Sequence, residues 1–565
     1  MRAISANCAA PQTRAPVARA ARNPVRQELR ALYFASAIYH LRLFGGSPRG
    51  VSLPLEPWPG ERGRGDMLLA GEFRFENEYV RAPSPPWRAD AGEEWRAALH
   101  SFQWLGDIAA VGSEAAWQTA RDWTADWIKR FEIYDRLAWR ADVIGNRLFA
   151  WLEHFERLGA DAALRRALLQ SLARQTRHLA RIARKEELGI KRLAALRGLV
   201  AALAAQGHDR LLTRALTSLS QEAQTQILVD GGHIARSPAA QLAALRHLID
   251  ARAALIVSHT EIPPALQQAI DRSAPMLRFF RHGDGGLALF NGANEGEAAV
   301  IDRVLARADA KGRPPSTAPH SGFERLRAGH SLVLFDCGKP PPPGFDRSAH
   351  AELLAFEMSY GRDRLVVNCG AYNGPSEEWR AAMRATAAHS TVVAADMSAI
   401  TFSPDGGVAD GPQEVTSMRA EDAGAQWIAA SHDGYKKSLG LTHARQLFLA
   451  ADGEDLRGED RMTGRAGQGF AIRFHLHPQV QASITQDGNA ALLRLPSGIG
   501  WRLRTEGAVL SIAESIYLGS GDVKKTRQIV LDGHVGSNGA VVKWGIRREA
   551  KRPVETAQPA LSTEL

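Results

Sequence analysis

The chain of 565 residues is long enough for two or three domains, which excludes a miniprotein or a single small binding module. Hydrophobic residues make up 45% and charged residues 23%, as in soluble globular proteins, so a mostly disordered or collagen-like chain is excluded. The formal charge of +9 favours an anionic partner such as a polyanionic sugar, a nucleic acid or a lipid surface, although compositional bias explains it as well. No cluster of Lys and Arg alternates with aromatic residues, so we predict no nucleic-acid binding.

Cysteine use and targeting signals are sparse. Cys8, Cys337 and Cys369 form no CxxC pair, which argues against a disulfide framework and a cysteine-rich zinc site, while one bridge between the last two stays open. Residues 1–30 are rich in arginine and lack a continuous apolar run, so we predict no secretory signal there. The apolar run at 31–45 is too short to cross a bilayer, and no transmembrane helix is predicted.

A long helical array is predicted from about residue 90 to residue 280. Apolar residues recur there at the i, i+3, i+4 and i+7 spacing of helices, as in NRLFAWLEHFERL and KRLAALRGLVAALAAQ. Short breaks containing Gly and Asp, such as 159–161 and 207–209, join several of these helices as antiparallel pairs. Stacked helical hairpins of this kind form bundles, solenoids or toroids.

The pattern changes to strands near residue 310. Residues 311–326 are rich in proline and turn-forming residues, which marks a domain boundary. Downstream, segments such as HSLVLFDCG and GFAIRFHLH alternate with turns, which predicts an antiparallel sandwich of roughly ten or more strands. The predicted organisation is a leading segment (1–89), an all-α domain (90–310), a β-sandwich domain (311–550) and a C-terminal tail (551–565). No glycine-rich phosphate-binding string follows a strand, so we predict neither dinucleotide binding nor a P-loop.

Two imidazoles and an amide are predicted to meet at one end of the sheet. His350 precedes a strand that pairs with the strand ending at Asn368, and His389 begins the next strand. Two imidazoles with an oxygen ligand suit zinc, although an asparagine is a weak donor. The alternative is that each histidine bonds to the backbone at a strand end.

Several strings in this region resemble the heparinase II/III family of polysaccharide lyases. SAHAELLAFE, VVNCGAY and AAHSTVV match the family's sandwich motifs in order and approximate spacing, DGGHIARSP matches a segment of its toroid, and SHDGYKKSLGLTHARQLFL matches a strand pair. The resemblance covers about residues 90–545. It implies an α+β multidomain fold, in which an N-terminal all-α (α/α) toroid is followed by a C-terminal antiparallel β-sandwich.

The resemblance also implies a function. Family members cleave acidic, uronate-containing polysaccharides by β-elimination without an organic cofactor, and they typically act in the cell envelope or periplasm. An acidic polysaccharide is therefore the expected partner. Because no export signal is readable at the N-terminus, a cytoplasmic location stays open.

Several family positions carry different residues in this chain. The family's zinc ligands His, Asp and His fall on His350, Asn368 and His389, so the carboxylate ligand of a structural zinc ion is missing. A catalytic histidine of the family falls on Ser348, and the toroid's Asn-His pair falls around Ile190 and Lys191. The resemblance therefore points to a divergent subgroup or to an inactive site.

Elimination on a uronide requires a group that stabilises the carboxylate, a base for the C5 proton and an acid for the leaving oxygen. Lys191 and Arg236 are the candidates for the first role and His233 is the candidate base. Tyr372 and Tyr435 are the candidate acids. Each of these residues has a structural role as its alternative.

Four further residues are candidates for substrate binding. Asn146 and Arg147 interrupt an apolar helix and could face the inner wall of a toroid, with a helix cap as the alternative. Ser348 and Arg384 lie in or beside the family strings. The helical half also contains tryptophans that could stack on sugar rings or fill the helix core: Trp104, Trp117, Trp123, Trp127, Trp139 and Trp151.

Two other functions are alternatives to the predicted lyase. One is a non-catalytic protein that binds acidic glycans, that is, a pseudo-lyase. The other is a glycoside hydrolase on the same scaffold, which would need two carboxylates about 5–10 Å apart. Glu153, Asp142 and Asp230 are the candidates for such a pair. The oligomeric state is not predicted.

Overall fold

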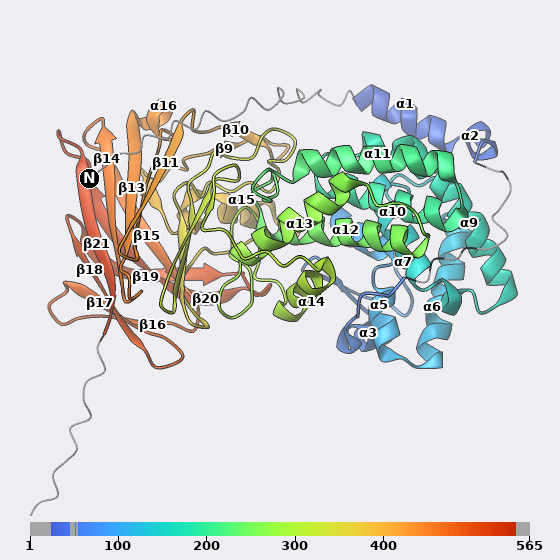
Figure 1. Ribbon diagram of the computed structural model, residues 1–565, viewed down its shortest axis with the longest axis horizontal. Helices are drawn as coiled ribbons and strands as arrows, with labels where there is room; N and C mark the ends of the chain where they lie inside the picture. Colours follow the sequence, from blue (N-terminus) through green and yellow to red (C-terminus); the bar gives the residue numbers. More distant parts are fainter. Residues whose placement is uncertain (1–23, 44, 46–50, 52, 54, 550–565) are drawn as a thin grey trace, which may run out of the picture.

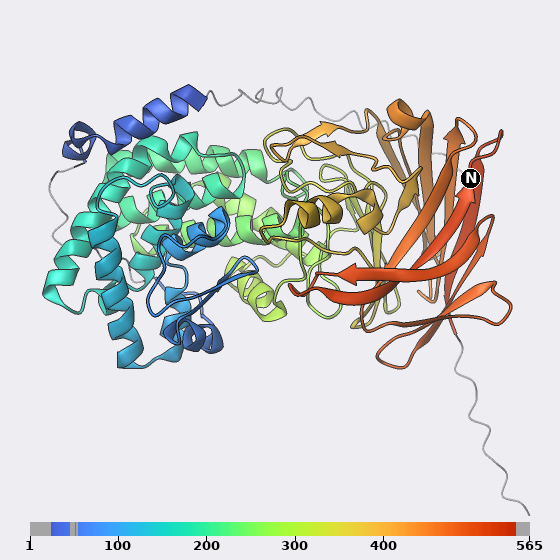
Figure 2. The same ribbon diagram turned by 180° about the vertical axis from the view of Figure 1, so that it is seen from behind.

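The computed structural model describes residues 24–43, 45, 51, 53 and 55–549, which form a helical half followed by a β half (Figure 1). The two halves lie end to end along the longest axis of the molecule, as the view from behind also shows (Figure 2). The last helix of the first half ends at Ala308 and the first strand of the second half begins at Thr317.

The helical half contains the following elements: α1 (Pro24–Ala35), α2 (Ala37–Leu41), α3 (Arg62–Leu69), the hairpin β1 (Glu72–Phe75) and β2 (Glu78–Arg81), α4 (Glu93–Ser101), α5 (Leu105–Val111), α6 (Glu114–Arg130), α7 (Ala141–Glu153), α8 (Phe155–Leu158), α9 (Ala162–Ile182), the 3-10 helix η1 (Ala183–Lys185), α10 (Ile190–Gln206), α11 (Asp209–Gln226), α12 (Pro238–Val257), α13 (Pro264–Phe279) and α14 (Ala298–Ala308). None of the helices in the described part of the chain is long and apolar enough to cross a membrane.

The helices form an inner and an outer layer. Helices α7, α10 and α12 are buried on most of their faces, and α10 packs against both of the others, whereas α9, α11 and α13 are amphipathic and cover them. Helices α7 and α10 approach closely because Gly145 faces Gly198: a Cβ atom at Gly198 would lie 2.1 Å from the Gly145 carbonyl oxygen. All six tryptophans named above are buried, so they serve as helix core.

The β half contains the following elements: β3 (Thr317–Ala318), β4 (Phe323–Ala328), β5 (Ser331–Asp336), β6 (Phe356–Tyr360), β7 (Asp363–Val367), α15 (Glu377–Arg384), the 3-10 helix η2 (Thr386–Ala388), β8 (Val392–Ala394), β9 (Thr401–Phe402), β10 (Val408–Asp410), β11 (Val415–Asp422), β12 (Ala425–His432), α16 (Lys436–Leu439), β13 (Leu441–Leu449), β14 (Asp455–Gly464), β15 (Gly469–Leu476), β16 (Gln481–Ile484), β17 (Ala490–Arg494), β18 (Gly500–Glu506), β19 (Val509–Tyr517), β20 (Lys524–His534) and β21 (Ala540–Arg548).

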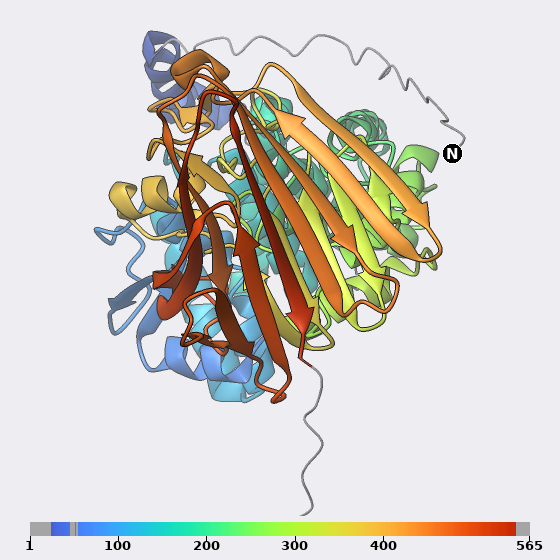
Figure 3. The ribbon, with the colours of Figure 1, turned by 90° about the vertical axis from the view of Figure 1, so that its left-hand side faces the viewer.

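Two large antiparallel sheets form a sandwich. The eight-stranded sheet has the order β11-β12-β13-β14-β21-β18-β17-β16 and forms the end of the molecule that faces the viewer in Figure 3. The nine-stranded sheet has the order β19-β20-β15-β7-β6-β5-β4-β3, with β8 also paired to β15, and the main core of this half lies between the two sheets. Cys337 and Cys369 are both buried and free, so no disulfide joins them.

The topology brings the predicted histidines to one end of the nine-stranded sheet. Strand β15 pairs with β8 through Phe470–Ile472 and then with β7 through His475 and Leu476. The residues before β8 therefore lie beside the residues that follow β7. The loop before β6 reaches the same end because β6 and β7 are antiparallel neighbours.

Candidate functional site

The boundary between the two halves is crossed by a chain of ion pairs that begins at the amino-terminal ends of the inner helices. The Arg140 guanidinium contacts Glu93 at 2.7 Å, Glu94 at 3.3 Å and Asp142 at 2.7 Å. Glu94 also accepts from the Lys191 ammonium at 2.7 Å, so one carboxylate serves two cations. These two cations hold the pKa of the Glu94 carboxyl below its usual value although burial opposes them.

This series of ion pairs continues into the β half. Lys191 lies 4.0 Å from Glu187, and the Glu187 carboxylate lies 2.5 Å from Arg347, which precedes Ser348 in the β half. We call the seven linked side chains the seam network: Glu93, Glu94, Arg140, Asp142, Glu187, Lys191 and Arg347. With all groups ionised, its four carboxylates outnumber its three cations, and each cation already has a carboxylate partner.

His233 lies in the core of the helical half. Its Nε2 bonds to Gln226 Oε1 at 2.8 Å, its Nδ1 accepts from the Ala235 amide, and its own amide donates to Gln241. The side chain is 2% exposed, and burial lowers the pKa of the imidazole to about 3. The structure thus uses both ring nitrogens of the predicted base to hold the loop between α11 and α12.

Arg236 fastens the two halves to each other. It donates to the Ser321 and Lys339 carbonyls at 2.7 and 2.8 Å and pairs with the Asp336 carboxylate, all in the β half. Its guanidinium also lies over the Phe323 ring. This predicted carboxylate-binding residue is therefore buried and its donors are used within the chain.

The two candidate acids have different surroundings. Tyr435 is buried and its hydroxyl donates to the Val392 carbonyl at 2.8 Å, while burial raises its pKa well above the usual value. Tyr372 is half-buried beside Trp379, and its hydroxyl has no hydrogen-bond partner among the described residues. The structure does not bring either tyrosine into contact with His233.

Asn146 and Arg147 are engaged inside the toroid. The fully buried Arg147 lies over the Trp127 ring and donates to the Gln175 side chain and to two main-chain carbonyls. Asn146 accepts from Arg197 at 2.5 Å. Both side chains therefore join inner helices to their neighbours.

Two of the three carboxylates considered for a glycoside hydrolase lie far apart, and the third is bonded to the β half. Asp142 and Glu153 lie at opposite ends of α7, eleven residues apart, which places their backbones about 16 Å from each other. Asp230 accepts from the amide and hydroxyl of Ser321 instead. Asp142 and Glu153 therefore lack the spacing of about 5–10 Å that glycoside hydrolysis needs.

Ser348 and Arg384 lie near the predicted metal ligands but differ in exposure. Ser348 is exposed. Arg384 donates to the Ala349 and Gly406 carbonyls, each at 2.8 Å, and its guanidinium lies over Phe402. Arg384 therefore holds the loop that carries His350.

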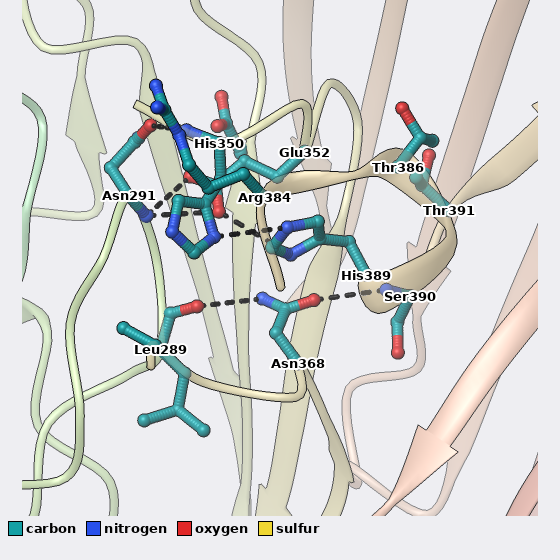
Figure 4. Close-up of polar contacts among 12 residues, drawn as sticks. Leu289, Asn291, His350, Glu352, Asn368, Arg384, Thr386, His389, Ser390 and Thr391 are labelled. Carbon is teal, nitrogen blue, oxygen red and sulfur yellow. Dashed lines mark hydrogen bonds and ion pairs between the residues drawn. The ribbon is translucent and has the colours of Figure 1, made fainter. Parts of the chain in front are cut away.

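Two of the three predicted metal ligands do meet, and a different residue completes the group (Figure 4). His350 Nδ1 lies 3.3 Å from His389 Nε2, and Glu352 Oε2 lies 3.6 Å from His389 Nδ1. One ligand atom from each of these three buried residues can be chosen so that all lie within 4.8 Å of one another. Burial lowers the pKa of His350 to about 3, so its imidazole is neutral at pH 7, which is the form that binds metals.

Asn368 is not the third member of this group, contrary to the set predicted from the sequence. Its amide nitrogen donates to the Leu289 carbonyl at 3.3 Å, and its amide oxygen accepts from the Ser390 amide at 3.0 Å (Figure 4). The Asn368 amide therefore bonds to the main chain through both its nitrogen and its oxygen. Glu352 stands only two residues after His350 in the string SAHAE, so the sequence contained the signal for the carboxylate that the prediction missed.

Asn291, which the sequence analysis did not single out, positions two of the three ligand candidates. Its amide lies 3.0 Å from each oxygen of the Glu352 carboxylate, and its side-chain oxygen accepts from the His350 amide at 3.1 Å. The residue adopts a left-handed backbone conformation with φ 44°, which asparagine tolerates better than most residues.

A second pair of histidines, His432 and His443, lies within the sandwich, and their network reaches the main chain beside His389. His443 lies between His432 at 3.2 Å and Asp460 at 2.7 Å. Arg445 also pairs with Asp460 and donates to the Ser390 carbonyl, next to His389. The HDGY and HxR strings of the sequence thus form a buried network.

Comparison with known proteins shows which family this chain belongs to. A family model described as "Heparinase II/III-like, C-terminal" matches residues 310–545. The FtsZ-localized protein C of Caulobacter vibrioides (strain NA1000 / CB15N) is 35% identical over 543 residues, which cover 91% of this chain and 93% of that protein. The chain belongs to the heparinase II/III-like family. The resemblance inferred from the sequence motifs is therefore confirmed.

Solved structures confirm the fold of this heparinase II/III-like chain. A heparinase III structure matches with a TM-score of 0.71 at 14% identity, covering 92% of this chain and 89% of that one. The heparan sulfate lyase HepC of Pedobacter heparinus matches with a TM-score of 0.59 at 15% identity, covering 94% and 91%. The predicted toroid followed by an antiparallel sandwich is confirmed, and at these identities the likeness concerns the fold alone.

Proposed function

We propose that this heparinase II/III-like chain is a binding protein that keeps the lyase scaffold without its elimination chemistry. Elimination requires an accessible base and a cation that is free to neutralise the uronate carboxylate. The candidate base His233 uses both ring nitrogens within the core, and Arg236 uses its donors to join the two halves. The remaining cationic candidate, Lys191, is paired with Glu94.

The seam network is the observation that carries this proposal. A uronate entering at this boundary would meet four carboxylates of the chain and cations that already have partners. Because like charges at short range repel and displaced ion pairs must be replaced, the network disfavours an acidic glycan at this position.

The relative named FtsZ-localized protein C supports a second part of the proposal. That protein aligns with this chain over nearly the whole length of both, including the helical half. We therefore propose that this chain also localises with FtsZ and acts there by binding. This location replaces the cell envelope or periplasm that the lyase resemblance alone favours.

The absence of lyase activity is tested with a panel of uronate polymers. The purified protein is incubated with heparan sulfate, chondroitin sulfate and polygalacturonate, and the ultraviolet absorbance of the unsaturated product is followed. We expect no product, whereas heparinase III added to heparan sulfate serves as the positive control. Sustained product formation that scales with the concentration of this protein would refute the proposal.

The association with FtsZ is tested by sedimentation with FtsZ polymers. We expect the protein to enter the pellet only when FtsZ is polymerised with a GTP analogue. Equal amounts in the pellet with and without polymers would contradict the association and leave the first part of the proposal standing.

A lyase function remains the second candidate because of Tyr372. Its hydroxyl is the one candidate acid or base among the described residues for which the structure gives no internal partner. If product forms in the polymer assay, the variant Tyr372→Phe should abolish it. A fully active Tyr372→Phe variant would exclude this tyrosine as the acid.

A further inference from the structure

We infer that the outer face of the eight-stranded sheet binds an extended peptide segment that carries acidic side chains around an aromatic one. The inference rests on the proposed binding function and adds to it the surface and the kind of partner. This face lies at the end of the molecule opposite the helical half, and no described element covers it (Figure 3).

A groove of about 870 Å³ lies on this face. Its lining includes a row of residues that pair across five adjacent strands, from β12 to β18: Trp427, Phe448, Arg457, Gly545 and Arg504. Gly545 leaves the row open between the two arginines, because apart from its chain neighbours a Cβ atom there would meet no atom closer than 3.9 Å. Neighbouring strands lie about 4.8 Å apart, so the row is about 19 Å long and matches about six residues of extended peptide.

One end of the row is aromatic. Trp427 is 40% exposed, and the centroid of its ring lies 4.8 Å from that of Phe448. The Arg457 guanidinium lies over the Phe448 ring, 5.5 Å from its centroid. Tryptophan and arginine are enriched among the side chains that contribute most to protein–protein binding, and aromatic rings pair readily with a further ring. This end of the groove therefore fits an aromatic side chain of the partner.

The other end of the groove carries unpaired positive charge. Arg504, Lys543 and Arg547 are exposed, and none of the three forms an ion pair with a described residue. Lys543 and Arg547 stand two residues to either side of Gly545 on β21, so their side chains project from the same face as the row. Four carboxylates also line the groove, and three of them pair with arginines: Asp455, Glu459 and Glu549. The groove thus has more unpaired cations than unpaired carboxylates, which favours a partner with acidic side chains.

The carboxylates of the groove favour a peptide over a uniformly charged polymer. A nucleic acid or a sulfated glycan carries anionic groups along its whole length, and those groups would also meet the four carboxylates. An extended peptide carries acidic side chains only at some positions, and its N–H groups donate to carboxylates. The lining side chains are spread over residues 427–549 and come together only in the folded sheet, so the sequence shows no cluster of cations and aromatic residues.

The test is fluorescence anisotropy with the purified full-length protein and fluorescein-labelled peptides of about eight residues, in which glutamates flank one phenylalanine at different positions. We expect the wild type to bind acidic peptides of this panel saturably, and not the same peptides with lysine in place of glutamate. Arg504→Glu combined with Arg547→Glu should lower the affinity at least about tenfold, because these exposed arginines attract the carboxylates of the peptide. Lys524→Glu combined with Arg527→Glu is the matched control, because it makes the same change of charge at exposed positions of β20 in the other sheet, and it should change the affinity less than about twofold.

Three outcomes overturn the inference. Absence of saturable binding to every acidic peptide removes the site, equal losses in the two double variants reduce the binding to net charge, and tighter binding of a labelled oligonucleotide or heparin fragment assigns the face to a polyanion. Trp427→Ala should lower the affinity as well, and an unchanged affinity would contradict the role of the aromatic end.

The peptide assay contains no FtsZ, so its failure is distinguishable from failure of the proposed function. Sedimentation with FtsZ polymers without peptide binding would refute this surface alone. Peptide binding without sedimentation would refute only the association with FtsZ.

Discussion

Several candidate residues lie within strings that resemble the family's motifs, but their side chains serve the scaffold. His233 and Arg236 were predictable as a motif from the string DGGHIARSP, but their orientation was not. Whether a loop histidine faces a cleft or the core depends on partners such as Gln226 and Gln241, which lie seven and eight residues away in sequence and come close only in the folded helices. Glu352 was missed because the family pattern directed attention to Asn368.

Removal of the Arg236 charge should destabilise the protein strongly. Arg236→Met leaves the buried Asp336 carboxylate without its cation, and breaking a buried pair in this way costs about 3–5 kcal/mol. The free energy of unfolding, measured by denaturant titration, checks this value. The matched variant Arg347→Met breaks an ion pair whose arginine is half-exposed and should cost less than about 1 kcal/mol. Equal losses for the two variants would contradict the role of Arg236 in joining the halves.

At the scale of elements, hydrophobic periodicity predicted the helical array and the strand-rich half, but not the details that position the site. The leading segment 1–89 was predicted without elements, yet its described part contains α1, α2, α3 and the β1–β2 hairpin. Short elements such as these carry weak periodic signals and form by packing on the toroid. The pairing of β15 with both β7 and β8 joins segments about 80–110 residues apart, and no local pattern indicates it.

Close approach of α7 and α10 makes Gly198 sensitive to substitution. An alanine in a helix is favoured over glycine by about 1 kcal/mol, so Gly198→Ala would stabilise an isolated helix. In the protein its Cβ would lie 2.1 Å from the Gly145 carbonyl oxygen, and we expect a net loss of about 1–3 kcal/mol from overpacking. The midpoint of thermal unfolding shows whether Gly198→Ala lowers or raises the stability. At the exposed Gly63 in α3 an added Cβ would meet only the Glu61 carboxylate, at 3.8 Å, so Gly63→Ala should stabilise the protein. A stabilising Gly198→Ala would contradict the packing of α7 against α10.

Over the whole molecule, buried histidines make stability dependent on pH. Burial lowers the pKa of His100 and His154 to about 4 and that of His178 and His233 to about 3, whereas an unfolded histidine titrates near 6.5. Below pH 6.5 the unfolded chain therefore binds protons that the folded chain does not. The stabilisation is complete above pH 6.5 and is lost as the pH falls toward 3–4.

The expected result is a steep loss of stability in acid. Each of these histidines contributes up to about 1.4 kcal/mol per pH unit between its unfolded and folded pKa values. The free energy of unfolding should consequently fall several-fold faster between pH 6 and 5 than between pH 8 and 7. A protein equally stable at pH 5 and pH 7 would show that these imidazoles are solvated.

The seam network connects the two halves through the ion pair between Glu187 and Arg347. Its residues come from α4, from the first turns of α7 and α10 and the segments just before them, and from a loop of the β half. The sequence predicted the fold but could not show that Lys191 lies beside Glu94, nearly a hundred residues away. With all groups ionised, four carboxylates face three cations at this boundary, so we propose that the chain's own charges disfavour an acidic glycan there.

The most direct test of this account is the affinity of the protein for a uronate oligosaccharide, measured by titration calorimetry before and after two carboxylates of the seam network are neutralised. Glu94→Gln combined with Glu187→Gln frees Lys191 and Arg347. The account predicts no measurable binding for the wild type and salt-sensitive binding for the double variant. Wild-type binding as tight as that of the variant would contradict it.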